Sequence, residues 1–221
     1  MKRNKIIYFL LMFLPILITL STLPFLPSQV PAHYDATGAV TRYGSKYESL
    51  IFPLLIIPFG YFMLYMGKLA SKDETNQNNN NEKVVVVTGI MTLILFNVMT
   101  GFFLYTDFAQ VENLNTISLD LSKVFFSILG IFMIVIGNIM PKCKKNSMIG
   151  LRTKWSMSSE VNWKKSQKYG GISFIVSGIL LLVGNLFVFS GSACFIYSIL
   201  IMLINIIIDV IYTYSIAKIQ N

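Results

Sequence analysis

Charged residues are scarce in this chain. Asp, Glu, Lys and Arg make up 13% of its 221 residues, whereas a typical soluble domain carries about 25%. Hydrophobic residues make up 54%, and they gather in long runs instead of being spread along the chain. This composition argues against a soluble protein and indicates a membrane protein. The runs cover residues 6–26, 50–67, 84–105, 121–140, 170–189 and 193–216.

Each run is long enough to cross a bilayer as a helix, which takes about 20 apolar residues, with a range of about 17–25. Charge inside the runs is limited to Lys123, at the start of the fourth, and Asp209, in the sixth. The first run is longer than the core of a signal peptide, which has about 7–15 residues, so we expect an uncleaved first helix. The sequence therefore predicts an all-α, polytopic membrane protein with six transmembrane helices in one domain, residues 1–221.

Positive charge is unevenly divided between the two sides of the predicted domain. Basic residues mark the cytoplasmic side of a membrane protein. Of the 18 Lys and Arg, only Arg42, Lys46 and Lys123 fall on one side, and the others lie at both termini and in loops 68–83 and 141–169. Both termini are therefore predicted to be cytoplasmic. We attribute the net charge of +8 to this asymmetry and expect contact with anionic lipid, not direct contact with nucleic acid.

Histidine and cysteine are also scarce, with one His and two Cys in the chain. A zinc site takes three or four ligands, usually His, Cys or carboxylates, and the loop around His33 has no second His or Cys. We therefore expect no metal site, and we expect His33 to hydrogen-bond within its loop or to contact an external ligand. No nucleophile elbow, phosphate-binding glycine loop or HExxH motif is present, so we predict no enzyme activity and no cofactor.

The connections between the hydrophobic runs differ in character. Loop 27–49, predicted to lie outside, has prolines and turn residues typical of a structured loop. Residues 71–83, SKDETNQNNNNEK, are low in complexity and are expected to form a flexible cytoplasmic linker.

Loop 141–169 is the basic cytoplasmic loop, and it holds both Trp and eight of the 18 Lys and Arg. Ser158 or Ser159 is expected to cap a helix that begins at Glu160, because an acidic residue suits a helix N-terminus. Gly170 and Gly171 are then expected to turn the chain into the fifth membrane helix.

The outer and basic loops carry a resemblance. Residues 26–46 read LP..VP.H.D..G....YGSK, and residues 146–171 read NSMIGLRTKWSMSSEVNWKKSQKYGG. Both resemble signatures of the SdpI family of bacterial multi-pass membrane proteins. The chain departs from the family pattern at Gln167, where a histidine is common. The matching positions are Pro31, His33, Gly38, Gly44 and Lys46 in the outer loop, and Asn146, Gly150, Arg152, Thr153 and Trp163 in the inner motif.

This resemblance implies a location in the bacterial cell membrane and a function in immunity. Family members protect the producing cell from a secreted peptide toxin that attacks membranes, and some hold a cytoplasmic transcriptional repressor at the membrane once toxin is bound. The resemblance thus implies a toxin as an external partner and a repressor as an internal one. Toxin or ligand contacts are expected in the outer loop, at Pro31, His33, Asp35, Gly38, Gly44 and Lys46.

Polar residues inside the spans leave alternatives open. Asn205 and Asp209 share one face of the last helix, and a carboxylate in a span usually finds a partner, for which Arg152 and Lys154 are candidates. This carboxylate could lock the helix to the basic loop. It could instead be the ion site of a small ion-coupled transporter or permease, which is the alternative to immunity. A third interpretation is a membrane-bound regulator whose basic loop binds a cytoplasmic DNA-binding protein.

The remaining intramembrane polar and small residues are expected to serve helix packing. Amides can hydrogen-bond across helices, and small residues allow helix backbones to approach closely. The residues concerned are Asn97, Asn138 and Asn185 for hydrogen bonds, and Gly130, Gly137, Ser177 and Gly178 for close packing.

Overall fold

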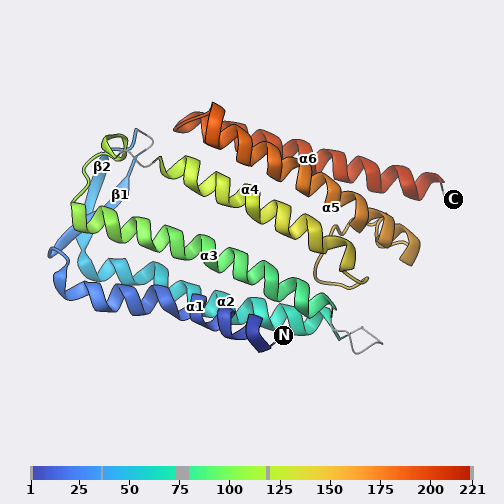
Figure 1. Ribbon diagram of the computed structural model, residues 1–221, viewed down its shortest axis with the longest axis horizontal. Helices are drawn as coiled ribbons and strands as arrows, with labels where there is room; N and C mark the ends of the chain where they lie inside the picture. Colours follow the sequence, from blue (N-terminus) through green and yellow to red (C-terminus); the bar gives the residue numbers. More distant parts are fainter. Residues whose placement is uncertain (1, 36, 73–79, 118–119, 220–221) are drawn as a thin grey trace. The chain divides into compact units, whose positions relative to one another are not determined.

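The computed structural model describes residues 2–35, 37–72, 80–117 and 120–219. Six helices in these residues are long and apolar enough to cross a membrane (Figure 1). The protein is therefore an all-α, multi-pass membrane protein, as the sequence predicts. The helices are α1 (Lys2–Thr22), α2 (Ile51–Ala70), α3 (Asn80–Ala109), α4 (Leu121–Ile139), α5 (Glu160–Val183) and α6 (Ser192–Ile219).

The start of α5 confirms one prediction and corrects another. The helix begins at Glu160, and the Ser159 hydroxyl caps it by accepting a hydrogen bond from the Asn162 N–H at 3.0 Å. However, α5 continues through Gly170 and Gly171 without a turn. The two glycines are buried and provide room for the chain around Met140 and Pro141, so they serve packing and do not break the helix.

The predicted linker 71–83 is shorter than expected, because α3 begins at Asn80. Glu82 in the first turn of α3 suits the positive end of the helix dipole. Residues 73–79 of the linker lie outside the described residues.

The chain divides into two compact units. The hairpin unit comprises residues 2–62 and 90–121, and the basic-loop unit comprises residues 63–89 and 122–221. The single membrane domain expected for residues 1–221 stays a prediction.

Hydrogen bonds to backbone carbonyls join the helices of the hairpin unit. The Tyr8 hydroxyl of α1 donates to the Gly60 carbonyl of α2 at 2.8 Å, and the Asn97 amide of α3 donates to the Leu11 carbonyl of α1 at 2.8 Å. The interhelical hydrogen bond predicted for Asn97 is thus confirmed. Edge-to-face aromatic contacts of Phe52 and Phe59 with Phe96 add to the packing of α2 on α3.

In the basic-loop unit, α4 and α5 approach until their backbones touch. A Cβ on Gly178 would lie 2.6 Å from the Gly130 carbonyl oxygen, and a Cβ on Gly130 would lie 2.7 Å from the Gly178 carbonyl oxygen. Gly137 and Gly171 form a second reciprocal pair of the same kind. The predicted packing role of Gly130, Gly137 and Gly178 is therefore confirmed.

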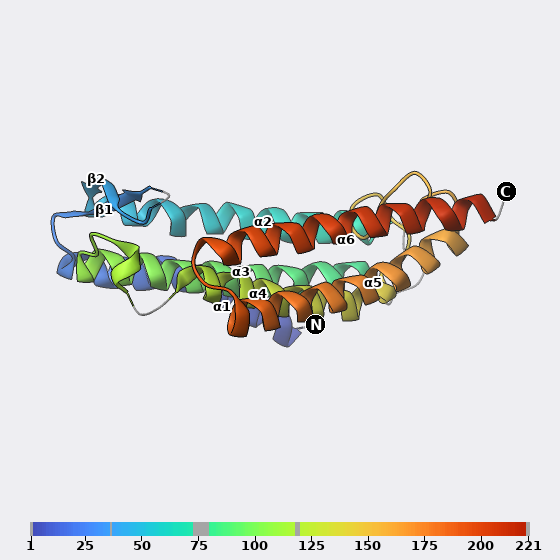
Figure 2. The ribbon, with the colours of Figure 1, turned by 90° about the horizontal axis from the view of Figure 1, so that it is seen from above.

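Helices α5 and α6 lie side by side and are joined by a short turn (Figure 2). The Asn185 amide donates to the Ser198 hydroxyl of α6 at 3.1 Å, which confirms the predicted interhelical hydrogen bond. Asn138, by contrast, is exposed and forms no hydrogen bond within the described part of the chain, so its predicted interhelical bond is wrong.

Candidate functional site

The outer loop folds as a two-stranded antiparallel hairpin of β1 (Gln29–Tyr34) and β2 (Val40–Ser45). Asp35 begins its turn, and its Oδ1 accepts hydrogen bonds from the Thr37 hydroxyl at 2.6 Å, the Thr37 N–H at 2.8 Å and the Ala39 N–H at 3.1 Å. The hydroxyl bond from Thr37 is the largest of the effects that hold the pKa of Asp35 below its ordinary value. Gly38 has a φ of 83°, a conformation that other residues rarely adopt.

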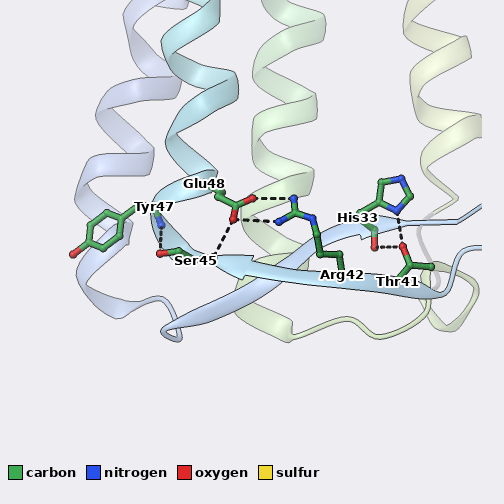
Figure 3. Close-up of polar contacts among 6 residues, drawn as sticks. All are labelled: His33, Thr41, Arg42, Ser45, Tyr47 and Glu48. Carbon is green, nitrogen blue, oxygen red and sulfur yellow. Dashed lines mark hydrogen bonds and ion pairs between the residues drawn. The ribbon is translucent and has the colours of Figure 1, made fainter.

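The end of the hairpin is fixed by a carboxylate (Figure 3). Glu48 accepts hydrogen bonds from the Arg42 guanidinium at 2.9 and 3.3 Å and from the Ser45 N–H at 3.2 Å. A Cβ on Gly44 would collide with this carboxylate, so a glycine leaves the room that Glu48 needs. Arg42 was expected only as one of the few positive charges on this side, and its pairing with Glu48 was not predicted.

The six outer-loop residues predicted to contact a ligand fall into two groups. Pro31, Gly38 and Gly44 are buried and shape the hairpin. His33 and Asp35 are exposed and Lys46 is half-buried. The His33 Nδ1 lies 2.5 Å from the Thr41 hydroxyl oxygen, which bears out the expected hydrogen bond within the loop. His33 also stands opposite Arg42 in the strand pairing, so two nitrogen-rich side chains share one exposed stretch (Figure 3).

The hairpin is held by the segment that follows α3. The Tyr34 hydroxyl donates to the Val111 carbonyl at 2.9 Å, and the Val40 N–H donates to the Glu112 carbonyl at 2.9 Å. Burial is the main cause of a raised pKa for Tyr34. Sequence reasoning missed this docking, although an isolated two-stranded hairpin is only marginally stable and needs a further partner.

The basic loop is ordered by side chains that bond to its own backbone. The Asn146 Oδ1 accepts from the Met148 N–H at 2.7 Å and the Ile149 N–H at 2.8 Å, and its amide donates to the Lys144 carbonyl at 2.7 Å. Trp163, 1% exposed, donates from Nε1 to the Cys143 carbonyl at 2.8 Å.

Gln167 of α5 forms two hydrogen bonds with the loop. Its Oε1 accepts from the Leu151 N–H and its Nε2 donates to the Leu151 carbonyl, both at 3.0 Å. Gly150 has a φ of 99°, and a Cβ there would lie 2.7 Å from the Gln167 Oε1 and 3.0 Å from the Trp163 ring. The position at which the chain departs from the family signature is therefore an internal structural contact.

The motif residues Arg152 and Thr153 have different environments. The Thr153 hydroxyl donates to the Thr213 hydroxyl of α6 at 3.0 Å, which ties the loop to the last helix. Arg152 is exposed and has no hydrogen bond or ion pair within the described part of the chain. Of the five inner-motif residues, Arg152 is thus the one whose functional group is free to meet another molecule.

Asp209 has a different partner from the one expected. It is 2% exposed, and its Oδ1 accepts a hydrogen bond from the Ser173 hydroxyl of α5 at 2.6 Å. Arg152 and Lys154, the predicted partners, are both exposed, and Lys154 lies 5.0 Å from the centre of the Trp155 ring. The Asp209 carboxylate therefore joins α6 to α5. The contact between α6 and the basic loop is the hydrogen bond between Thr153 and Thr213.

Within the described residues, no three of His, Cys, Asp and Glu lie close enough together to hold a metal ion.

Asn205 is 4% exposed and shares a face of α6 with Asp209.

Comparisons with known proteins match both loops. Residues 142–213 match the model of the SdpI/YfhL protein family, and residues 10–57, which hold the outer-loop signature, match a domain described as being of unknown function (DUF1648). The chain is 24% identical to Immunity protein SdpI of Bacillus subtilis (strain 168), over 100% of this chain and 99% of that protein. No solved structure matches the chain. The chain is a multi-pass cell-membrane protein that is similar to the SdpI/YfhL family over residues 142–213 and to an SdpI immunity protein along its length.

Proposed function

We propose that this protein is an immunity protein, which protects the bacterial cell from a secreted peptide toxin that attacks membranes. The observation that carries this proposal is the similarity to Immunity protein SdpI along the whole chain, which includes both signature loops. Both loops are fixed by hydrogen bonds, which supports the proposal, because binding surfaces are commonly formed by loops held on a rigid scaffold.

In the proposed orientation, both termini and the basic loop are cytoplasmic and the hairpin is outside. The concentration of Lys and Arg at the termini and in the basic loop supports this orientation. Single cysteines introduced at Thr41 and at Ser147, both exposed, test it in a background without Cys143 and Cys194. A membrane-impermeant maleimide should label the first in intact cells and the second only after lysis, and the reverse result would invert the topology.

The hairpin is proposed to meet the toxin through its exposed residues His33 and Asp35, with Arg42 and Lys46 nearby. To separate contact from folding, His33→Ala is compared with Thr41→Val, because these two residues hydrogen-bond to each other. If His33 only stabilises the loop through Thr41, both variants should reduce protection to the same extent. Contact with toxin predicts that His33→Ala alone reduces protection.

Arg152 is proposed to bind a cytoplasmic partner, such as a transcriptional repressor. Its exposure and its lack of a partner in the described residues support this role. We expect Arg152→Ala to leave the thermal stability unchanged and to abolish co-purification of the partner. Lys165→Ala, which removes an exposed charge from nearby α5, is the matched control and should retain it.

The decisive experiment is survival. The chain is expressed in a sensitive bacterium, which is then challenged with a panel of membrane-active peptide toxins. Protection against one toxin, at equal expression and membrane insertion, supports immunity, and loss of protection in Arg152→Ala would link it to the inner motif. Equal killing of expressing and empty cells by every toxin would contradict the proposal.

An ion-coupled transporter is distinguished by Asp209→Asn. The Oδ1 of an asparagine can still accept the Ser173 hydrogen bond, so we expect the contact between α5 and α6 to remain. Immunity should therefore survive this change, whereas transport coupled to the titration of the carboxylate should not.

A further inference from the structure

A groove of about 270 Å³ runs between residues 169–180 of α5 and residues 201–208 of α6. Its walls are mainly apolar and exposed, and Val176 and Ile204 are each 51% exposed. We call this feature the α5–α6 groove. Because both helices are membrane spans, an apolar groove on their surface can take only an occupant that enters the membrane.

Asn205 lies in this groove without a hydrogen-bond partner. Its side chain lines the groove, is 4% exposed and forms no hydrogen bond within the described part of the chain. The amides of Asn97, Asn185 and Gln167 all have partners. An amide without a partner in hydrocarbon costs free energy, so Asn205 does not stabilise the folded protein.

The depth of Asn205 excludes the polar parts of lipid as its partner. The residue stands thirteen positions after Ser192 and fourteen before Ile219, the two ends of α6. At a helical rise of about 1.5 Å per residue, it lies about 20 Å from each end. This is the middle of a hydrocarbon core about 30 Å thick, beyond the reach of headgroups and water.

The recessed position of Asn205 also argues against a second copy of the chain. In a symmetric pair each groove would face the other, and two amides that are both at the bottom of a groove would not meet. A partner must carry a polar group that protrudes from an otherwise apolar segment. A membrane-inserted helix with one polar side chain meets both requirements.

Two small residues of α5 line the groove. Ser173 and Ser177 are spaced i and i+4 on α5, and small residues at this spacing allow another helix to come close. Asp209 holds Ser173 in place, and Tyr169 is fixed by stacking on Tyr212 at a ring distance of 3.6 Å. The polar and aromatic groups along the groove are thus held in position before any occupant enters.

We propose that the α5–α6 groove binds the membrane-inserted helix of the toxin, and that a polar side chain of this helix hydrogen-bonds to Asn205. The identity of the occupant rests on the proposed immunity function. Protection then includes capture of toxin that has already entered the bilayer, in addition to contact at the hairpin.

The first test is the stability of Asn205→Leu in lipid nanodiscs. If Asn205 serves ligand binding, this variant should melt at or above the melting temperature of the unchanged protein, because an amide without a hydrogen-bond partner is removed. Asn185→Leu, which breaks the bond to Ser198, is the control and should melt several degrees lower. A comparable fall for Asn205→Leu would show a structural role and overturn the proposal.

The second test measures helix binding in liposomes. The probe is a labelled twenty-residue leucine helix with one central asparagine, at low peptide density, and the all-leucine helix is its control. Energy transfer should show several-fold stronger association of the asparagine helix with the unchanged protein, and none of this preference with Asn205→Leu. Equal association of both helices would contradict the proposal, as would self-association of the chain that depends on Asn205.

These tests separate the groove from the proposed function. A preference for the asparagine helix without protection of cells would retain the groove as a helix-binding site and reject immunity. Full protection by Asn205→Leu against a toxin that the unchanged protein resists would retain immunity and reject the groove.

Discussion

Gln167 binds both backbone groups of Leu151, with the N–H and the carbonyl each at 3.0 Å from the amide. The Leu151 carbonyl also accepts a hydrogen bond from the Ser156 hydroxyl at 2.8 Å, so Gln167 is the partner on which the Leu151 N–H depends. Gln167 is fully buried, so water cannot compensate for the loss of these bonds. The order of the basic loop, and with it the placement of the neighbouring Arg152, depends on this contact.

Gln167→Ala should therefore destabilise the basic loop. It leaves the Leu151 N–H without a partner, whereas the Leu151 carbonyl keeps the hydrogen bond from the Ser156 hydroxyl at 2.8 Å. An unsatisfied buried group costs about 1–3 kcal/mol. We expect a lower melting temperature in nanodiscs and faster proteolysis between residues 144 and 158. Lys168→Ala removes an exposed side chain from the next position and should change neither. Unchanged proteolysis in Gln167→Ala would show that the loop is ordered without the hydrogen bonds between Gln167 and Leu151.

The contact between α4 and α5 makes a second prediction. In Gly178→Ala the new Cβ would lie 2.6 Å from the Gly130 carbonyl oxygen and 3.0 Å from the Ile134 nitrogen. Backbone atoms cannot move aside as a flexible side chain can, so the helices must separate, at a cost of about 1–3 kcal/mol.

Gly101→Ala is the matched control, because its Cβ would meet no atom within 4 Å. Alanine is favoured over glycine inside a helix by about 0.5–1 kcal/mol, so this variant should be slightly more stable. Thermal unfolding of both variants in the same nanodiscs measures the difference. Equal effects of the two substitutions would contradict close packing of α4 on α5.

The sequence predicts the six helices because the length of an apolar run and the thickness of a bilayer are both known. The start of α5 is also predictable, because Ser159 and Glu160 give a local signal. Glycines are less informative: Gly170 and Gly171 suggest a turn in the sequence but are packing positions in the structure. Local sequence cannot say which role a glycine has, because the answer depends on a helix far away in the chain.

Contacts between distant segments explain most of what the sequence could not provide. Gln167 was noticed only as a departure from a family pattern, and its two bonds to Leu151 depend on how the loop folds back. Asp209 was expected to pair with a cation, yet a hydroxyl on the neighbouring helix satisfies it. Opposite charge is visible in a sequence, but proximity in the fold is not.

A third prediction concerns the protonation of Asp35. Its pKa is lowered in the folded hairpin, mainly by the Thr37 hydroxyl, from an ordinary value of 3.8. Stabilisation of the turn by the carboxylate is therefore complete above pH 3.8 and is lost as the pH falls through the lower, folded pKa. We expect Thr37→Ala to raise the pKa of Asp35 toward its ordinary value.

Carbon-13 NMR of the labelled carboxyl groups measures this pKa directly. Thr41→Ala is the control, because the Thr41 hydroxyl bonds to His33 and not to Asp35, and it should leave the titration of Asp35 in place. Asp35→Asn should remove this contribution to the pH dependence while keeping an oxygen that accepts the turn hydrogen bonds. A titration of Asp35 that is the same with and without Thr37 would contradict the assignment.

The two tryptophans make the last prediction. Trp163 is 1% exposed and donates to the Cys143 carbonyl, whereas Trp155 is half-buried and touches Tyr214 with a ring distance of 5.1 Å. Trp163→Phe removes the hydrogen bond and leaves a cavity, so we expect a loss of about 2–4 kcal/mol. Trp155→Phe keeps an aromatic ring at a partly exposed position and should cost less than about 1 kcal/mol.

Because the chain has only these two tryptophans, each variant also isolates the fluorescence of the other tryptophan. Emission should be blue-shifted in Trp155→Phe and red-shifted in Trp163→Phe, and the opposite order would place the wrong tryptophan inside the loop.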